Sequence, residues 1–246
     1  MLYLNDRDSS DQIVDFLKSS VADGYVILSQ FIDDRILEAI TRSRQPVISF
    51  DFVKSGINGI PVVARDTISS YHTAWAETSS EERKSSAFIH FGRSLHKQDN
   101  LLLTAPPDAD IRDIVLRCGS GNALISYRNV KMELTRCFDE LVSRKLLWCC
   151  SDIVALAIFD LLKEHGIVPG EQIKIVGFDN IEGTTAGFDH PVLSTVDPCW
   201  AECGKVLADV IIKEIQEGRK IPSTIPVESK FIFRSSFRKR SKRGNS

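Results

Sequence analysis

Short apolar runs alternate with amphipathic segments along the first quarter of the chain. Apolar residues recur at helical spacing from Ile13 to Val21, which predicts a helix over 11–21. The same periodicity predicts a second helix over 33–43. Three apolar runs between and after these helices are predicted strands: 25–29, 46–51 and 60–66. Strands that alternate with helices over short links are typical of a parallel sheet in an α/β domain.

The pattern is less regular in the middle of the chain. Residues 67–84 are polar and rich in serine, and they form either a surface loop or an irregular helix. The pattern then predicts a helix over 85–97, a strand over 100–105, a helix over 109–118, a strand over 122–127, a helix over 131–143 and a strand over 145–150. These elements extend the α/β alternation.

The clearest pattern lies between residues 147 and 196. An apolar run, a polar turn, an amphipathic helix, a Pro-Gly loop and a second apolar run follow one another, and the second run ends in acid. This order predicts one strand–helix–strand unit with Ser151, Asp152 and Asp179 at the tips of its strands. Ligands of open parallel sheets sit outside the carboxyl ends of the strands, so these side chains are candidate ligand contacts.

The last fifth of the chain contains a long amphipathic segment and a basic end. Apolar residues repeat at three and four positions from Trp200 to Ile211, and Gly218 marks the end of the predicted helix. The following IPVESKFIFRSS predicts a closing hairpin or an edge strand. The basic tail over 239–246 is either a solvated end or a nucleic-acid contact, and it lacks the aromatic or helical scaffold of the latter.

Composition narrows the class of protein. The 246 residues are 43% hydrophobic and carry a net charge of −2, which is ordinary for a soluble globular protein and gives no basic field for nucleic acid. No apolar run approaches the ~20 residues of a membrane span, and the N-terminus does not resemble a signal peptide. These features predict a cytoplasmic protein.

The six cysteines have no paired CxxC spacing, and the histidines do not cluster with them. They are therefore expected to be reduced, structural thiols. The alternative is a metal site or redox pair at Cys199 and Cys203, which lie one helical turn apart. No metal and no cofactor is expected.

Several blocks of the chain together resemble the effector-binding domain of the LacI/GalR family. The most specific block reads CSDIVALAIFDLLKEHGIVPGEQIKIVGFDN, and it precedes a second one, HPVLSTVDPCWAECGKVLADVIIKEI. Two further segments of the chain resemble family blocks. DGYVILSQFIDDRILEAITRSRQPVISFD is similar to the family's first-lobe block, and VESKFIFRSS is similar to its closing strand. The resemblance implies a periplasmic-binding-protein-like fold of type I, with two Rossmann-like lobes of parallel sheet joined by three crossovers and a ligand clamped between them.

The resemblance also implies domain boundaries. The first lobe would comprise 1–66 and 195–220, the second 67–194 and 221–238, and the basic tail 239–246. Two parts of the family pattern have no counterpart here: the N-terminal helix-turn-helix, and the first strand and helix of the first lobe. Either the chain is a fragment or another segment fills that place, and DNA would be contacted only through a domain that this chain does not contain.

Six residues are candidate ligand contacts by resemblance. Asp179 matches the family carboxylate that accepts hydrogen bonds from a sugar or a base; its alternative role is a helix or turn cap. Ser151 stands where relatives often have a ligand-binding Asn, and Asp152 is either a ligand contact or the N-cap of the next helix. The remaining three candidates are Asp51, which faces the cleft from the first lobe, Arg112, near the family's ligand-gripping Arg, and Tyr127, which is either a stacking or a core aromatic.

The function that the resemblance implies is effector sensing in a transcriptional regulator. A small polar effector such as a sugar, a sugar phosphate or a nucleobase would bind between the lobes of a homodimer and modulate DNA binding. An alternative is the solute-binding protein of a sugar transporter, which shares the fold. The sequence does not predict an enzyme, because no nucleophile elbow, phosphate-cradling glycine motif or matched acid/base pair is found.

Overall fold

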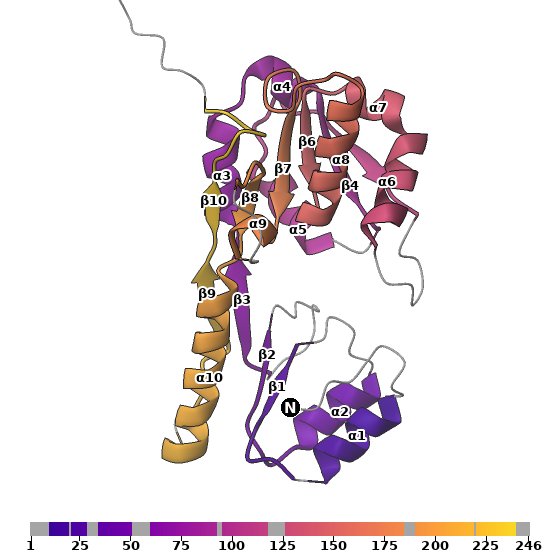
Figure 1. Ribbon diagram of the computed structural model, residues 1–246. Coiled ribbons are helices and arrows are strands. Elements are labelled where there is room, and N and C mark those ends of the chain that lie inside the picture. The colour runs from indigo at the N-terminus through magenta and orange to yellow at the C-terminus, as the bar shows by residue number, and fades with distance from the viewer. Residues whose placement is uncertain are drawn as a thin grey trace, which may run out of the picture. The chain divides into compact units, whose positions relative to one another are not determined.

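The structure is a computed structural model that describes residues 10–19, 21–28, 34–50, 60–92, 95–117, 126–184, 190–218 and 220–239. The chain divides into two compact units (Figure 1). Unit 1 comprises residues 1–66 and 199–228, and unit 2 comprises residues 67–198 and 229–246. The chain therefore crosses between the units three times.

Unit 1 is built on a four-stranded parallel sheet in the order β1-β2-β3-β9. Its strands are β1 (Tyr25–Ile27), β2 (Val47–Phe50), β3 (Val62–Asp66) and β9 (Thr224–Glu228). Its helices are α1 (Ser10–Lys18), α2 (Asp34–Arg42) and α10 (Trp200–Glu217). These elements confirm the strands and helices that the apolar pattern predicts for the first 66 residues and for the long amphipathic segment.

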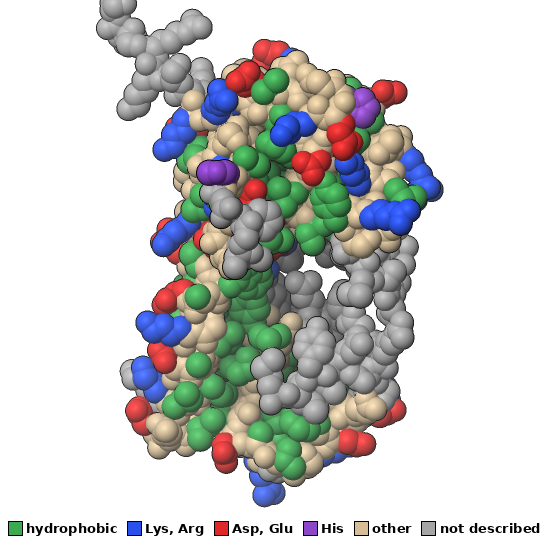
Figure 2. Space-filling view, in the orientation of Figure 1, with side chains coloured by type: hydrophobic (Ala, Val, Ile, Leu, Met, Phe, Trp, Pro, Cys, Tyr) green, Lys and Arg blue, Asp and Glu red, His purple; other side chains and the backbone are tan. Residues whose placement is uncertain are grey.

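The sheet of unit 1 separates two small apolar cores. Residues of α1 and α2 pack with Tyr25 and Val47, whereas α10 packs with Ile48 and Val63 through its own apolar side chains. An apolar face remains exposed, and Figure 2 shows it as hydrophobic side chains gathered over unit 1. Its large exposed residues on β1, just after β1 and on α10 include Val26, Leu28, Ile212 and Ile215.

Unit 2 is built on a six-stranded sheet in the order β10-β8-β7-β6-β4-β5. The strands are β4 (Ser86–His90), β5 (Ile111–Val115), β6 (Leu146–Cys149), β7 (Lys174–Phe178), β8 (Ser194–Asp197) and β10 (Lys230–Ile232). All neighbours pair in parallel except β10, which is antiparallel to β8. The helices are α3 (Ile68–Ala76), α4 (Ser80–Lys84), α5 (Leu95–Thr104), α6 (Tyr127–Arg136), α7 (Phe138–Val142), α8 (Asp152–Glu164) and α9 (Ile181–Thr184).

Two pairs of helices cover the sheet of unit 2. Helices α3 and α5 pack together, as do α6 and α8, and the sheet lies between these pairs (Figure 1). One continuous core includes the fully buried rings of Phe88, Trp148 and Phe178. Parallel strands covered on both faces are buried and largely apolar, and every residue of β4, β6 and β7 is buried. This core makes unit 2 a firm support for the loops that follow its strands.

The unit boundaries differ from the expected ones at two of the three crossings. The first crossing follows Asp66, as expected, but the second follows Pro198 and the third follows Glu228. The expected second-lobe segment 221–238 therefore begins with a strand of unit 1. The reason is that β9 pairs with β3 over its whole length, and only β10 joins the sheet of unit 2. IPVESKFIFRSS thus supplies edge strands to two sheets and does not form a hairpin.

The predictions for residues 85–118 were wrong in element type. The expected helix over 85–97 contains β4, the expected strand over 100–105 lies in α5, and the expected helix over 109–118 contains β5. A strand buried on both faces lacks alternation, so β4 resembled a helical segment. In α5, the three consecutive leucines point in different directions: Leu101 is buried, while Leu102 and Leu103 are exposed.

Residues 67–84, expected to be either a surface loop or an irregular helix, form the two helices α3 and α4. Ser79 begins α4 with a capping box in which Glu82 bonds back to the Ser79 N–H. The expected strand over 122–127 lies mostly outside the described residues, and Tyr127 is the first residue of α6. The expected helix over 131–143 is divided at Cys137 into α6 and α7.

Cysteines Cys137, Cys149, Cys150, Cys199 and Cys203 are free thiols. Within the described ranges, no cluster of three side chains could hold a metal ion. None of the helices that the structure describes is both long and apolar enough to cross a bilayer.

Candidate functional site

The strand order of unit 2 defines where a ligand would bind. The chain leaves β4 toward β5 and then returns to β6 on the other side of β4. This reversal is the topological switch point of the sheet, where ligands of open α/β folds bind outside the carboxyl ends of the strands. The carboxyl ends of β4, β6 and β7, with the residues that follow them, are called the strand-end edge of unit 2 below.

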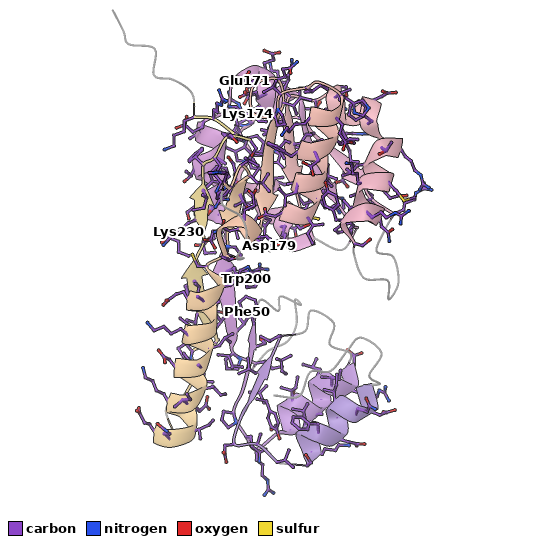
Figure 3. The ribbon with its side chains drawn as sticks, in the orientation of Figure 1. Phe50, Glu171, Lys174, Asp179, Trp200 and Lys230 are labelled. Carbon is purple, nitrogen blue, oxygen red and sulfur yellow. The ribbon has the colours of Figure 1, made fainter. Side chains whose placement is uncertain are left out.

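Asp179 directly follows β7 at this edge (Figure 3). Its backbone has a φ of 110° and that of Asn180 has a φ of 53°, conformations that cost free energy for residues other than glycine. The Asp179 N–H donates to the carbonyl oxygen of Val196 at 3.0 Å, which holds the turn against β8. The carboxylate is therefore fixed at the end of the strand rather than on a free loop.

Lys97 brings a cation to the same edge from α5. Its Nζ donates to the carbonyl oxygen of Cys150 at 2.7 Å and lies 3.9 Å from Asp179 Oδ1. The ammonium also sits 3.9 Å from the centre of the Phe178 ring, a cation–π distance. Only 13% of the side chain is exposed. The residues after β4, β6 and β7 thus meet around one ammonium group.

Lys97 was missed by the sequence reasoning. It lies at the end of the segment 85–97, which was predicted to be a helix but contains β4, and the helix α5 that carries Lys97 was predicted to be a strand. Had α5 been recognised as the helix that follows β4, a cation in its first turn would have been a candidate for the strand-end edge.

Asp152 supports the edge from inside. The residue is fully buried; its Oδ2 accepts from the Ile181 N–H at 2.8 Å, and its Oδ1 accepts from Thr195 Oγ1 at 2.7 Å. Burial raises the pKa of this carboxyl to about 7, although these two hydrogen bonds act to lower it. A Cβ on Gly177 would lie 2.0 Å from Oδ1, so the glycine before Phe178 makes room for this carboxyl.

Of the two roles expected for Asp152, the N-cap does not describe these contacts, and ligand contact stays a prediction. Helix α8 begins at Asp152 with Ser151 as its N-cap residue, so Asp152 is not the cap. Both of its oxygens are bonded within the protein rather than presented at the surface. Its position and contacts make it a residue that fixes the turn containing Asp179.

A second group of buried side chains holds this turn to β8 and to the segment after β10. Asn180 Nδ2 donates to Asp197 Oδ2 at 2.9 Å, and Asn180 Oδ1 accepts from Arg234 at 2.7 Å. Arg234 also donates to the carbonyl oxygen of Leu193 at 2.7 Å. Glu182 accepts from the Leu193 N–H at 2.7 Å. Each side of the turn is therefore fixed by hydrogen bonds from another strand or segment.

Ser151 lies at the same edge, between β6 and α8. As N-cap residue it uses its carbonyl oxygen, which accepts from the Ala155 N–H at 3.1 Å, and its side chain makes no capping bond. The residue is partly exposed. Its role in ligand binding stays a prediction.

Arg112 and Tyr127 bond to residues on α7 and α8, and their role in ligand binding stays a prediction. Arg112 is the second residue of β5, where its side chain is 64% exposed and its Nε lies 3.3 Å from Glu140 Oε1. The Tyr127 hydroxyl donates to Asp160 on α8. Desolvation, followed by this hydrogen bond, raises the pKa of Tyr127.

Unit 1 has an aromatic cluster at its own strand ends. Phe50 ends β2, Arg65 lies near the end of β3 and Trp200 begins α10 (Figure 3). The Arg65 guanidinium lies 4.9 Å from the Trp200 ring centre and 5.5 Å from that of Phe50. The two rings are 5.7 Å apart, and Trp200 is 42% exposed. Asp51, the candidate that follows Phe50, lies outside the described residues.

The chemistry of the two strand-end edges is suited to binding. A carboxylate and an ammonium group offer hydrogen-bond acceptors and donors to hydroxyl groups, and an exposed indole offers a stacking face. Asp179 and Lys97 face each other as an ion pair rather than as an acid and a base arranged around a nucleophile. These features define the class: an α/β protein of two units whose strand ends carry polar and aromatic binding groups.

Comparisons with known proteins identify the domain. A family model described as a periplasmic binding protein-like domain matches residues 122–237. The LacI-family transcriptional regulator from Enterococcus faecium with bound ribose superposes with a TM-score of 0.73 at 17% identity, covering 97% of this chain and 88% of that one. A CelR–cellobiose complex superposes with a TM-score of 0.70 at 16% identity, covering 92% of this chain and 69% of that one. The chain therefore has a periplasmic-binding-protein-like fold, which it shares with these regulators.

The curated relatives are repressors. The ribose operon repressor of Haemophilus influenzae is 28% identical over 90 residues, which are 37% of this chain and 26% of that protein. The transcriptional repressor PurR of Pasteurella multocida is 25% identical over 108 residues, 42% of this chain and 32% of that protein. The matched region thus spans only about a quarter to a third of these relatives.

Proposed function

We propose that this chain is the effector-sensing part of a LacI/GalR-type transcriptional regulator and that it binds a small neutral sugar at the strand-end edge of unit 2. Asp179 accepts hydrogen bonds from sugar hydroxyls, and Lys97 donates one. The observation that carries the proposal is the convergence of Lys97, Asp179 and the Cys150 carbonyl at the topological switch point.

The balance of charge favours a neutral ligand. The Lys97 ammonium stands 3.9 Å from the Asp179 carboxylate, so the two charges largely offset each other. A sugar hydroxyl both donates and accepts and can bond to both groups at once. A phosphate near Asp179 would instead meet a like charge. Ribose, which the Enterococcus faecium neighbour holds, is therefore the first candidate, and sugar phosphates are disfavoured.

A nucleobase is the second candidate, because several relatives are PurR repressors. The Trp200 and Phe50 rings of unit 1 favour it, since a planar base stacks on an aromatic face as readily as a sugar does.

The output of binding is a shift between conformations of a regulator. A ligand shifts such an equilibrium only by its differential affinity for the two states, about 1.4 kcal/mol for each tenfold ratio. The regulator acts as a homodimer, as the family resemblance implies, and reaches DNA through a helix-turn-helix domain. We propose no catalytic role: the polar groups of the edge bind and do not turn over a substrate. A transporter solute-binding protein is less well supported, since the named relatives are repressors.

A thermal-shift screen tests the proposal. D-ribose, D-glucose, D-ribose 5-phosphate and hypoxanthine are added at increasing concentration to wild type, Asp179→Ala and Asp139→Ala. Asp139 is an exposed carboxylate on α7 and serves as the matched control. A ligand raises Tm by mass action. We expect D-ribose to raise the Tm of wild type and of the control but not that of Asp179→Ala. A response to the phosphate or the base alone would contradict the neutral-sugar assignment.

A further inference from the structure

We propose that His90 is a positioning residue that holds Lys97 in its place at the strand-end edge of unit 2. This inference rests on the proposed function, because it concerns the same site. His90 ends β4, its side chain is only 4% exposed, and its ring is occupied at both nitrogens. Its ring contacts Asp113, Gly92 and Phe88, and it acts through them.

The hydrogen bonds define the tautomer of His90. The backbone N–H of Gly92 donates to Nδ1 at 3.0 Å, so Nδ1 carries no proton. The proton of the neutral ring is then on Nε2, which donates to Asp113 Oδ1 at 2.8 Å. The ring also stacks on Phe88, with centroids 5.1 Å apart. A buried ring with both nitrogens hydrogen-bonded has one orientation, so it can hold its hydrogen-bond partners in fixed positions.

The two partners of His90 lie on either side of the β4–α5 connection. Gly92, with a φ of 72°, begins the turn that leaves β4. Asp113 on β5 also accepts from Gln98 Nε2 at 3.2 Å, and Gln98 lies in α5. His90 thus fixes the start of the connection directly and the first turns of α5 through Asp113.

Lys97 is the neighbour of Gln98 in the helix that this arrangement holds. Its long side chain loses rotamer freedom on reaching the Cys150 carbonyl, which is an entropic cost. When α5 is held in a fixed place, this entropic cost is smaller, because the Lys97 side chain already leaves the helix in the direction of the Cys150 carbonyl. The sites that bind ligands tightly are those whose contacting groups are held in this way.

The experiment measures the position of Lys97 without a ligand. In protein labelled with 13C at the lysine Cε, a lysine lying over an aromatic ring gives a signal moved upfield by the ring current. Lys97 Nζ lies 3.9 Å from the Phe178 ring centre, so we expect an upfield signal from Lys97. Lys97→Met distinguishes this signal by its loss from those of other lysines over rings, such as Lys174 and Lys239. His90→Phe keeps the stacking on Phe88 but removes both hydrogen bonds. We expect the Lys97 signal to move toward that of an exposed lysine, and the Kd for D-ribose to rise about tenfold.

A conservative variant separates positioning from folding. In His90→Gln the side-chain amide can still donate to Asp113, so we expect partial return of the Lys97 signal and of ribose binding. If His90→Phe does not fold, His90→Gln and Gln98→Met carry the test through smaller movements of the same signal. A folded His90→Phe, or a Gln98→Met, with an unmoved Lys97 signal overturns the proposal. A moved signal in a protein whose wild type binds none of the four screened compounds keeps the positioning role and contradicts the proposed function instead.

Discussion

The strand-end edges of the two units are built in different ways. In unit 2, buried polar side chains hold the turn after β7: Asp152 at the start of α8 accepts from the Ile181 N–H, and Asn180 of the turn donates to Asp197 of β8. In unit 1, the corresponding edge carries the rings of Phe50 and Trp200 around the Arg65 guanidinium.

The difference teaches how each kind of contact depends on its support. A hydrogen bond to a sugar hydroxyl requires its acceptor at a defined distance and angle, so the carboxylate of unit 2 needs a fixed backbone. Stacking on an aromatic face tolerates larger displacements, so unit 1 needs less support. Substitutions inside unit 2 should therefore change both stability and affinity, whereas those at the unit 1 edge should change affinity alone.

The largest effect is expected from Asp152→Ala. This substitution removes the acceptor of the Ile181 N–H and of the Thr195 hydroxyl, and we expect it to lower the free energy of unfolding of unit 2 by about 2–4 kcal/mol. Asp152→Asn keeps one acceptor and should cost less. Urea unfolding in a Trp200→Phe background measures this change, because the remaining Trp75 and Trp148 both lie in the core of unit 2. Equal stabilities of Asp152→Ala and Asp139→Ala would contradict this role.

The pH dependence of unit 2 gives a related but smaller effect. The pKa of Asp152 is about 7 in the folded protein, above the unfolded value of about 4. The folded state therefore binds the proton more tightly, and the stability contributed by the protonated carboxyl declines as pH rises from about 4 to about 7. Urea unfolding at pH 5.5 and pH 8 should show a steeper decline for wild type than for Asp152→Asn. Parallel pH profiles for the two proteins would rule out this assignment.

Lys97 and Arg112 are the two candidate cations of unit 2, and their comparison sharpens the site. Lys97→Met removes the ammonium beside Asp179, and we expect the Kd for D-ribose to rise about tenfold, the worth of one hydrogen bond to a charged group. Arg112→Met removes an exposed ion pair with Glu140, which contributes at most about 1 kcal/mol to stability. It should leave the Kd unchanged. The reverse ranking, measured by calorimetric titration, would restore Arg112 as the ligand-binding cation.

The smallest effect is expected at the edge of unit 1. Trp200→Ala removes an exposed indole, and we expect the Kd for D-ribose to rise about fivefold, as for an aromatic contact worth roughly 1 kcal/mol. Trp200→Phe should retain most of the affinity. Urea unfolding of unit 2 should be the same for the alanine variant and wild type. A destabilised unit 2 would show that this edge is structural rather than a binding surface.

The sequence predicted what local patterns determine. The fold class followed from the alternation of strands and helices, and the comparisons confirm it. The placement of Asp179 at a strand tip followed from an apolar run that ends in acid. The periodicity also identified α8 and α10 from their apolar faces.

The remainder depends on contacts that no local pattern contains. The partners of Asp152 lie 29 and 43 residues away in the chain, so its role could not be distinguished from that of a cap. Lys97 was missed because β4, which is buried on both faces, was predicted to be a helix. The next two elements, α5 and β5, were then predicted as a strand and a helix. His90 lay within the same exchanged segment.

One titration tests the central claim most directly. D-ribose is titrated calorimetrically into wild type, Asp179→Ala and Asp139→Ala under identical conditions. A carboxylate that accepts charge-assisted hydrogen bonds contributes about 1.5–3 kcal/mol for each, so Asp179→Ala should weaken binding by about tenfold to more than a hundredfold, while the control binds like wild type. Equal affinities of Asp179→Ala and wild type for D-ribose would show that the strand-end edge of unit 2 is not the effector site.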